Sequence, residues 1–461
     1  MISTEEKVRT SAGKPNEQTP KEKKALGGAF FWLSAFYLVY CARPEDWIPG
    51  LSYLPLAKIS GIFAMLGFLT SLGKTKRGFR DLPKEATYLL IMIGLLFPSA
   101  LLSPVWRGGA FFKSIDFGKV YIAWVLTFLL VTNLDRLRRL VFIQAGSVAA
   151  ISVISIIKGH SHARLEGALG GIYSNPNDLA FAIVLSIPFG LVFLLTAKGI
   201  LRKIAWAFAM LMMAVALFLT ASRGGFVTLV VAGAVCLWHF GVKGRRLYLI
   251  VGAAVVVTVL LIVAGGKLED RFSAMSGEDL QGRQEHSAYG SFEERRELMT
   301  IALHGIAHYP ILGIGVHNFP NYSGKWRDVH VAYLQIAVEA GIPAMILYLM
   351  FFWRGFGNLR QLRKMTNAGP EVKLLTGALH SSLVGFVVGA CFAPEAYQYF
   401  PYFSVAYTSV LLAIVREQQD GTVPPNRFRP QLRQDVFAAQ PSINSSTAVG
   451  GSARSTPMYR L

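Results

Sequence analysis

The sequence predicts an all-α integral membrane protein with about twelve transmembrane helices, and three observations lead to this class. Of the 461 residues, 53% are hydrophobic and the mean hydropathy is +0.42. Only 16% of the residues are charged, against roughly 25% in an ordinary soluble domain. Long apolar runs also follow one another almost from end to end, so no stretch remains that would build a sizeable water-soluble core.

The apolar runs are long enough to cross a bilayer one by one. A helix needs about 20 apolar residues to cross ~30 Å of hydrocarbon. The first run lacks a small-residue cleavage pattern, so we expect it to be retained as a span rather than removed as a signal peptide. The predicted spans lie near residues 25–42, 51–72, 86–103, 118–134, 138–157, 178–197, 203–221, 224–241, 247–265, 330–353, 374–393 and 400–416.

The positive charges alternate between the connections, which predicts the orientation. An even number of spans places both termini on one side, and the excess of Lys and Arg assigns that side to the cytoplasm. About two thirds of the 46 Lys and Arg residues fall there. The net charge of +19 therefore indicates topology and contact with anionic head groups rather than binding of nucleic acid.

The chain is predicted to hold one membrane domain, residues 25–416, between two polar tails. Residues 1–24 and 417–461 are rich in Lys, Gln, Pro, Ser and Arg without apolar periodicity, which predicts cytoplasmic disorder. On the outer side, residues 266–329 between the ninth and tenth spans form a connection too long for a simple loop. Helical spacing at 292–308 predicts a small outer subdomain with at least one helix.

Arg223 lies in a short outer hairpin between two spans. One interpretation is an arginine that snorkels to the interface. However, a short outer turn is an unfavourable place for a positive charge under the topology rule. Ser222 can also cap the next helix, whose N-terminal N–H groups attract anions. We therefore expect Arg223 to meet an anionic ligand.

Two further positions on the outer side are candidates. Arg295 and Arg296 open the predicted loop helix, where the alternative is a solvated face with charges paired i to i+4. His330 lies at the start of the tenth span, and a single histidine is often structural. Its place at a helix mouth, on the same side as several arginines, favours a functional role. Deeper in that span, Gln335 and Glu339 lie one turn apart and are interpreted as a buried polar clamp.

The outer connection at 158–177 contains Arg164, a second candidate anion ligand, and two histidines that lack a third zinc ligand of suitable spacing. The run at 174–178 contains Asn177 and is typical of a turn that caps the sixth span, with hydrogen bonding to sugar as the alternative. The outer loops carry no Asp-x-Asp pair, so no metal and no cofactor is predicted. The three cysteines occur singly inside or beside apolar runs and are expected to be packing residues.

Three ordered segments resemble the bacterial O-antigen ligase and polymerase superfamily. They are the Ser-Arg-Gly-Gly hairpin at 222–225, the stretch 295–315 with its Gly-x-Gly at 313–315, and the stretch 330–341. Their order and spacing and the long outer loop are similar to that family over most of residues 25–416. Val331 departs from the pattern, because the family often has Asn after the histidine.

The resemblance implies a GT-C-like, metal-independent and inverting glycosyltransferase of a bacterial inner membrane, with its site facing the periplasm. Such enzymes move a glycan from a polyprenyl (undecaprenyl) diphosphate carrier, and the ligases attach O-antigen to the lipid A core in lipopolysaccharide biosynthesis. By this resemblance Arg223 and Arg295 would stabilise the departing diphosphate, and His330 would accept the proton of the acceptor hydroxyl. The expected substrate-binding residues are Arg296, Arg164, Asn177 and His317.

Three alternatives remain at this point. A polymerase that joins repeat units and a protein O-oligosaccharyltransferase would use the same groups with another acceptor. An anion transporter would use the arginines to line a path, but it predicts polar residues at the midplane of several spans, and the sequence has few. The expected partners are the lipid-linked donor, the lipid A core acceptor and membrane lipids.

Overall fold

The computed structural model describes residues 20–71, 77–158, 165, 171–173, 175–273, 283–365 and 369–422. Arg164, His160, His162 and most of the two predicted tails lie outside these residues. The chain divides into two units, residues 1–418 and 419–461. The helices and contacts that position the candidate site lie in the first unit.

The described residues form helices joined by short turns, with no strand among them. Three short 3-10 turns and one π-helical turn, η4 (Trp238–Val242), accompany them. In chain order the α-helices are α1 (Pro20–Ala42), α2 (Pro44–Trp47), α3 (Leu56–Leu69), α4 (Lys84–Leu101), α5 (Arg107–Leu130), α6 (Leu134–Lys158), α7 (Pro176–Thr196), α8 (Ile200–Leu219), α9 (Arg223–Leu237), α10 (Tyr248–Ser273), α11 (Arg283–His308), α12 (Phe319–Ser323), α13 (Ala332–Lys364), α14 (Pro370–Gly389) and α15 (Tyr399–Thr422).

Every predicted span coincides with one of these helices, which confirms a multi-pass membrane protein. In the described part of the chain, 8 helices are long and apolar enough to cross a membrane. Shorter apolar helical segments lie at Leu26–Ala42, Leu56–Leu69 and Tyr248–Val259. The remaining predicted span corresponds to α5, which carries Lys113, Asp116 and Lys119 before and at its middle.

Some predicted boundaries differ from the structure. The connection expected at 104–117 is largely helical, because α5 begins at Arg107. Its charged residues interrupt the apolar run without interrupting the backbone hydrogen bonds, and Lys119 pairs with Asp116 one turn away. At the ends of the membrane domain, α1 begins at Pro20 and α15 continues to Thr422, so helix extends slightly into both predicted tails.

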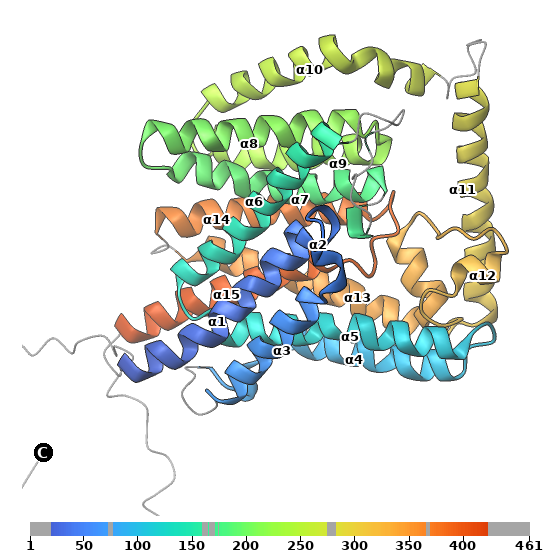
Figure 1. Ribbon diagram of the computed structural model, residues 1–461, viewed down its shortest axis with the longest axis horizontal. Coiled ribbons are helices and arrows are strands. Elements are labelled where there is room, and N and C mark those ends of the chain that lie inside the picture. The colour runs from blue at the N-terminus through green and yellow to red at the C-terminus, as the bar shows by residue number, and fades with distance from the viewer. Residues whose placement is uncertain are drawn as a thin grey trace, which may run out of the picture. The chain divides into compact units, whose positions relative to one another are not determined.

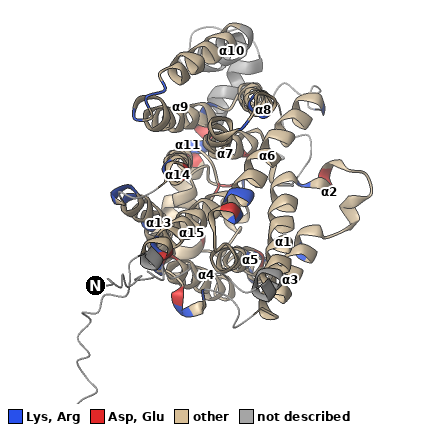
Figure 2. Ribbon diagram, turned by 90° about the vertical axis from the view of Figure 1, so that its left-hand side faces the viewer, with Lys and Arg blue, Asp and Glu red and all other residues tan. Residues whose placement is uncertain are grey.

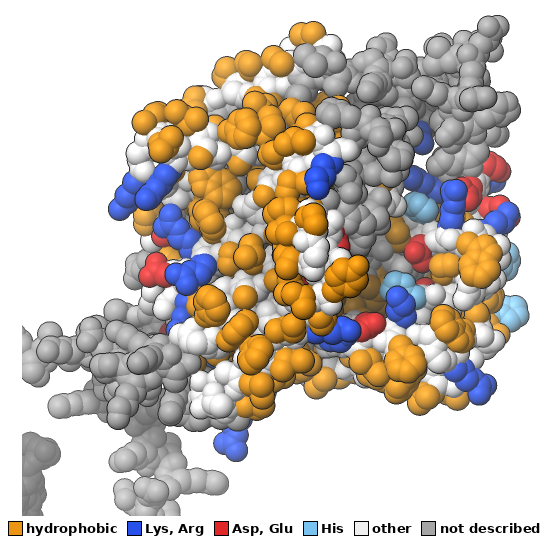
Figure 3. Space-filling view, in the orientation of Figure 1, with side chains coloured by type: hydrophobic (Ala, Val, Ile, Leu, Met, Phe, Trp, Pro, Cys, Tyr) orange, Lys and Arg blue, Asp and Glu red, His pale blue; other side chains and the backbone are white. Residues whose placement is uncertain are grey.

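The long helices of the first unit run side by side, and α11 runs across one of their ends with α12 beside it (Figure 1). Along the helices, Figure 2 shows mostly uncharged ribbon, with Lys, Arg, Asp and Glu at helix ends and in connections. Figure 3 shows an apolar surface between the two ends, and charged and histidine side chains gather around a hollow at the α11 end. This distribution fits a bundle whose middle faces lipid and whose ends face water.

Basic residues expected only to set topology also complete helix ends. Arg77 is buried, and its guanidinium donates to the carbonyls of Phe128 and Val131 at 2.9 and 3.0 Å. Arg136 donates to the carbonyl of Leu130 at 2.7 Å. These carbonyls are at the C-terminus of α5, where backbone acceptors lack partners and positive charge is favourable. The same charges therefore anchor the helix at the interface.

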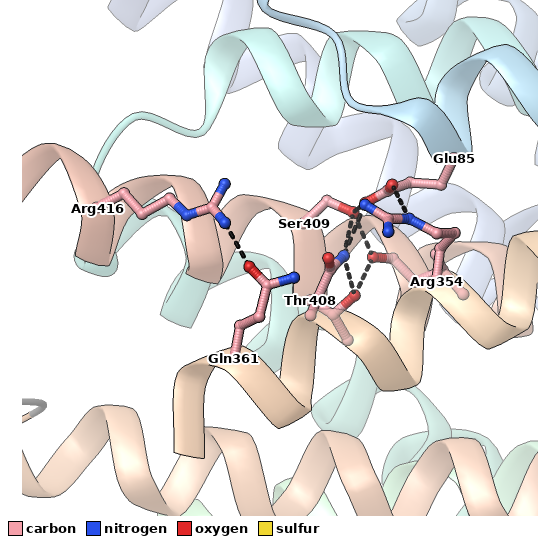
Figure 4. Close-up of polar contacts among 8 residues, drawn as sticks. Glu85, Arg354, Gln361, Thr408, Ser409 and Arg416 are labelled. Atoms are coloured by element: carbon pink, nitrogen blue, oxygen red, sulfur yellow. Dashed lines mark hydrogen bonds and ion pairs between the residues drawn. The ribbon is translucent and has the colours of Figure 1, made fainter. Parts of the chain in front are cut away.

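A buried polar network joins α4, α13 and α15 at the end opposite α11 (Figure 4). The Asn358 amide donates to a Glu85 carboxylate oxygen at 2.7 Å, and the Ser409 hydroxyl donates to the same oxygen at 2.6 Å. Arg354 lies 3.6 Å from the other Glu85 oxygen. A carboxylate buried among membrane helices is stable only with such partners, so this network fixes the three helices relative to one another.

Helix α13 contains a break at Gly341, with φ 86° and ψ 168°. This backbone conformation is essentially restricted to glycine. A Cβ atom at Gly341 would lie 2.1 Å from the carbonyl oxygen of Ile311. Gly313 also has positive φ, and a Cβ there would lie 2.5 Å from the Glu339 backbone. The glycines of two separate sequence segments therefore allow one close backbone contact.

We predict that cysteines placed at Lys325 and at Arg245 will react from opposite sides of the membrane. The positive-inside rule places Lys325, near α11, in the periplasm and Arg245, after η4, in the cytoplasm. In a background lacking Cys41, Cys236 and Cys391, an impermeant maleimide should label Lys325→Cys in intact cells and Arg245→Cys only after lysis. The reverse result would invert the topology and place the candidate site in the cytoplasm.

We also predict that Gly341→Ala lowers the stability of the protein by about 2 kcal/mol or more, because the Cβ atom meets backbone in a conformation reserved for glycine. The matched control is Gly357→Ala in the same helix, where no atom lies within 4 Å of the added Cβ. This control should be neutral or stabilising by up to about 1 kcal/mol. Thermal unfolding of both purified variants would test the difference, and equal melting temperatures would contradict it.

Candidate functional site

The α11 helix is fixed to α13 through a small apolar cluster. Leu298 and Ala302 are buried in it together with Val338 of α13. Gly305 lies one turn further along, and a Cβ atom there would come within 2.8 Å of Val338. Arg295 precedes Leu298 by three residues and is partly buried on the same face, whereas Arg296 is exposed. The packing therefore distinguishes two arginines that the sequence left equivalent.

Two ion pairs tie α11 to the loop that leads to His330. Glu294 pairs with Arg327 at 2.5 Å, and Glu297 pairs with Lys325 at 3.0 Å. The sequence had left open a solvated face with charges paired i to i+4 along the helix. In the structure Glu294 and Glu297 pair across to the loop, so α11 and the approach to α13 form one unit.

His330 lies two residues before the first turn of α13 and is partly buried. Its Nδ1 atom lies 3.0 Å from the carbonyl oxygen of Asp328. A carbonyl only accepts, so Nδ1 carries the proton and Nε2 keeps a lone pair. Burial, with a further contribution from the nearby positive charge of Arg295, lowers the pKa of His330 to about 4. The ring is neutral at physiological pH and can accept a proton at Nε2.

The residue after His330 is Val331, which has no side-chain amide to form hydrogen bonds at the start of α13. Val331 occupies the N-cap position of α13 and has no side-chain acceptor for the free N–H groups. The N–H of Ala332 instead donates to the carbonyl of Ala390, after α14, at 2.8 Å. The start of α13 is therefore held by a backbone contact between helices.

The hairpin at Arg223 is joined to the Asn177 segment. Ser222 caps α9 as predicted, since its hydroxyl oxygen accepts from the N–H of Gly225 at 3.1 Å. The same hydroxyl donates to the Oδ1 atom of Asn177 at 2.7 Å. Asn175 caps α7 by accepting from the N–H of Asn177 at 2.9 Å, which confirms that this run ends in a helix cap. Among the described residues, Arg223 has no ion pair.

A group of buried and partly buried carboxyls links the Arg223 and His330 halves of the site. The carboxyl groups of Asp178, which follows Asn177, and Glu395, between α14 and α15, lie close enough to interact electrostatically with each other. The carboxyl group of Asp328 lies close enough to interact electrostatically with Asp178. Burial raises the pKa of Asp328, and burial beside Asp178 raises the pKa of Glu395 well above its usual range. We call Asp178, Asp328 and Glu395 the acidic cluster.

Gln335 and Glu339, the residues of the predicted polar clamp, are buried, and their side chains accept hydrogen bonds from backbone N–H groups. Gln335 is 1% and Glu339 is 0% exposed. The Gln335 side-chain oxygen accepts from the N–H of Ala396 at 3.4 Å, and a Glu339 carboxyl oxygen accepts from the N–H of Phe319 at 3.3 Å. Beside Glu339, His317 has φ 57° and its ring centroid lies 5.0 Å from that of Tyr397. His317 therefore lies on the side of the site next to Tyr397.

The structure thus brings Arg295 next to His330 and places Arg223 beside Asn177, with the acidic cluster between the two pairs. His317 lies nearby, Arg296 points outward, and Arg164 is not among the described residues. Sequence reasoning did not assign a role to Asp178, Asp328 or Glu395, although Asp178 directly follows Asn177 and Asp328 lies two residues before His330. In the described part of the chain, no group of three or more His, Cys, Asp and Glu side chains could hold a metal ion.

Residues 208–349 match the family model described as O-antigen ligase. The matched segment runs from α8 into α13, so it contains Arg223, Arg295, Arg296, His317 and His330. This match supports membership of the O-antigen ligase superfamily and a membrane glycosyltransferase-like function of the ligase or polymerase type. A comparison with curated proteins gives no match.

We predict that the acid limb of the pH profile of this enzyme follows His330 and depends on Arg295. A base with a pKa of about 4 stays neutral down to about pH 5, so activity should fall only below that pH. Arg295→Gln removes a positive charge that disfavours the protonated ring, so the pKa of His330 should rise and the acid limb should move to higher pH.

The measurement is kcat/KM for the lipid-linked donor against pH, which reports the ionisation of the free enzyme. Arg296→Gln removes the same charge from the exposed face of α11 and is the matched control. An acid limb that moves equally in both variants, or in neither, would contradict the contact between Arg295 and His330.

Proposed function

We propose that this protein is an O-antigen ligase, which transfers a glycan from a polyprenyl diphosphate carrier to the lipid A core oligosaccharide at the periplasmic face of a bacterial inner membrane. The observation that carries this proposal is a neutral histidine with an available Nε2 atom beside an arginine, at the mouth of membrane helices. The match to the O-antigen ligase family supports the class of reaction.

In the proposed reaction, Nε2 of His330 accepts the proton of the acceptor hydroxyl as its oxygen attacks the anomeric carbon. The bond from that carbon to the carrier diphosphate breaks, and the diphosphate leaves with the bonding electrons. Attack and departure take place on opposite faces, so the anomeric centre is inverted. The hydrogen bond from Nδ1 to the Asp328 carbonyl holds the ring in the tautomer that this step requires.

Negative charge grows on the diphosphate as it departs, and we assign its stabilisation to Arg223 and Arg295. A guanidinium presents a fork of donors that matches phosphate oxygens. Arg223 opens α9, whose N-terminal dipole adds to the attraction for an anion. These groups can take the place of a divalent metal, so the proposed transfer is metal-independent. Asn177 and His317 remain candidates for sugar contacts, with Arg296 and Arg164 as secondary ligands.

Both substrates are amphiphiles, which suits a site built at helix mouths. Their lipid parts remain in the bilayer while their head groups reach the water-facing end of the bundle. A polymerase would bring a second lipid-linked glycan to the same base, and a protein O-oligosaccharyltransferase would bring a hydroxyl side chain. The acceptor is the point on which these alternatives differ.

We predict that purified protein in nanodiscs will join the glycan of a polyprenyl diphosphate donor to lipid A core in the presence of EDTA. His330→Ala should lower the single-turnover rate by about 100-fold or more while donor binding stays near wild type. Arg223→Ala and Arg295→Ala should slow transfer by a similar order and also weaken donor binding, because each contacts charge present before and during the reaction.

Arg296→Ala is the matched comparison for Arg295→Ala and should slow transfer less, because Arg296 is exposed and is only a secondary ligand in this proposal. A product extended by donor glycan alone would identify a polymerase. Activity that is lost in EDTA and restored by magnesium or manganese would exclude the metal-free mechanism. If His330→Ala transfers at the wild-type rate, the base is a different residue.

A further inference from the structure

A second cluster of basic side chains lies at the far ends of α9 and α13, away from the candidate site. Arg223 and His239 are at opposite ends of the membrane segment formed by α9 and η4, about 24 Å apart at ~1.5 Å per residue. Likewise, α13 begins near His330 and ends near Arg363. The two clusters therefore lie at opposite faces of the membrane.

This second cluster surrounds a cavity of about 300 Å³. Its polar lining consists of His239, Lys243, Arg363 and His380, and its apolar lining consists of Ala234, Val235 and Trp238. No lining residue carries a carboxylate. In the described part of the chain, neither Lys243 nor Arg363 forms an ion pair. The cavity therefore concentrates positive charge without a counterion from the protein.

The two histidines are held in a defined arrangement. Nε2 of His239 lies 2.9 Å from Nδ1 of His380, and their rings meet edge to face. One ring must donate this hydrogen bond and the other must accept it. When both rings are neutral they carry two N–H groups, and one of these is used in the bond between the rings. The two nitrogens outside that bond then carry one N–H donor between them, and one added proton makes both of them donors. The pair thus supplies donors to an anion in either state.

The backbone is adapted to this arrangement. At η4 the helix widens to a π-helical turn, in which the N–H of Lys243 donates to the carbonyl of Trp238 at 2.9 Å. π-helical turns are rare overall, and many of those that occur lie at functional sites. Gly377 of α14 lets the helices approach, because a Cβ atom there would lie 3.2 Å from that of His239. The positive-inside rule explains the lysine and the arginine but not the paired histidines or the cavity.

We infer that the cavity lined by His239, Lys243, Arg363 and His380 binds an anionic phosphate group, supplied by a phospholipid head group of the cytoplasmic leaflet. Basic pockets between membrane helices on the cytoplasmic side are suited to such head groups. Trp238 is 54% exposed beside the cavity, and aromatic side chains of this kind favour the level of the head groups. The lysine and arginine contact the phosphate charge, and the histidines donate hydrogen bonds to its oxygens.

The test uses purified full-length protein in neutral detergent, with bound phosphatidylglycerol counted and titrated by native mass spectrometry. The variant Lys243→Gln/Arg363→Gln removes two charges that line the cavity. The control Arg245→Gln/Lys364→Gln removes two charges at the same helix ends that do not line it. We expect binding to weaken at least about tenfold in the first variant and to remain near wild type in the control.

Phosphatidylcholine and inorganic phosphate are the comparison ligands. Selective retention of phosphatidylglycerol that inorganic phosphate does not displace would identify the lipid head group as the source. Displacement by inorganic phosphate would support the same site with a soluble phosphate as its ligand. Equal binding of phosphatidylcholine and phosphatidylglycerol, or equal loss in the two double variants, would overturn the inference. His380→Gln, which keeps the charge of Lys243 and Arg363, gives a second variant for the cavity.

Discussion

Three backbone hydrogen bonds join the loop at 310–315 to the broken turn of α13. The N–H groups of Ile314 and Gly315 donate to the carbonyls of Val338 and Glu339, each at 2.9 Å, and the N–H of Ile342 donates to the carbonyl of Pro310 at 2.8 Å. Where a membrane helix is interrupted, its freed backbone groups need partners from protein because lipid supplies none. The loop provides these partners, and the contact is possible only because residues 313 and 341 are glycines.

The candidate site depends on this contact. His330 lies two residues before the part of α13 that precedes the break, and the loop that binds the broken turn follows α11, which carries Arg295. The apolar cluster around Leu298 and the ion pairs of Glu294 and Glu297 then fix the rest of α11 against the same region. The position of Arg295 relative to His330 is thus set by packing of the outer subdomain on a membrane helix rather than by either element alone.

The sequence predicted the helices better than it predicted their ends. Long apolar runs mark a span reliably because lipid admits few alternatives to helix, but α5 extends through Lys113, Asp116 and Lys119, where the apolar signal fails and backbone hydrogen bonding continues. Some candidate site residues could be selected from the sequence because they are charged or titratable residues at the ends of predicted spans, as with Arg223 and His330. The preference for Arg295 over Arg296 and the proximity of Asp178, Asp328 and Glu395 depend on how distant segments pack, which no local pattern reports.

The acidic cluster raises an electrostatic question, because three carboxylates near the two arginines would repel a diphosphate. Their environment answers it. Burial raises the pKa of Asp328, and burial beside Asp178 raises that of Glu395 well above its usual range, so both carboxyls favour the neutral form more than an exposed carboxyl does. The cluster therefore carries less negative charge than its composition suggests. Arg223, which has no ion pair among the described residues, and Arg295 therefore leave this region with positive charge that an anion can contact.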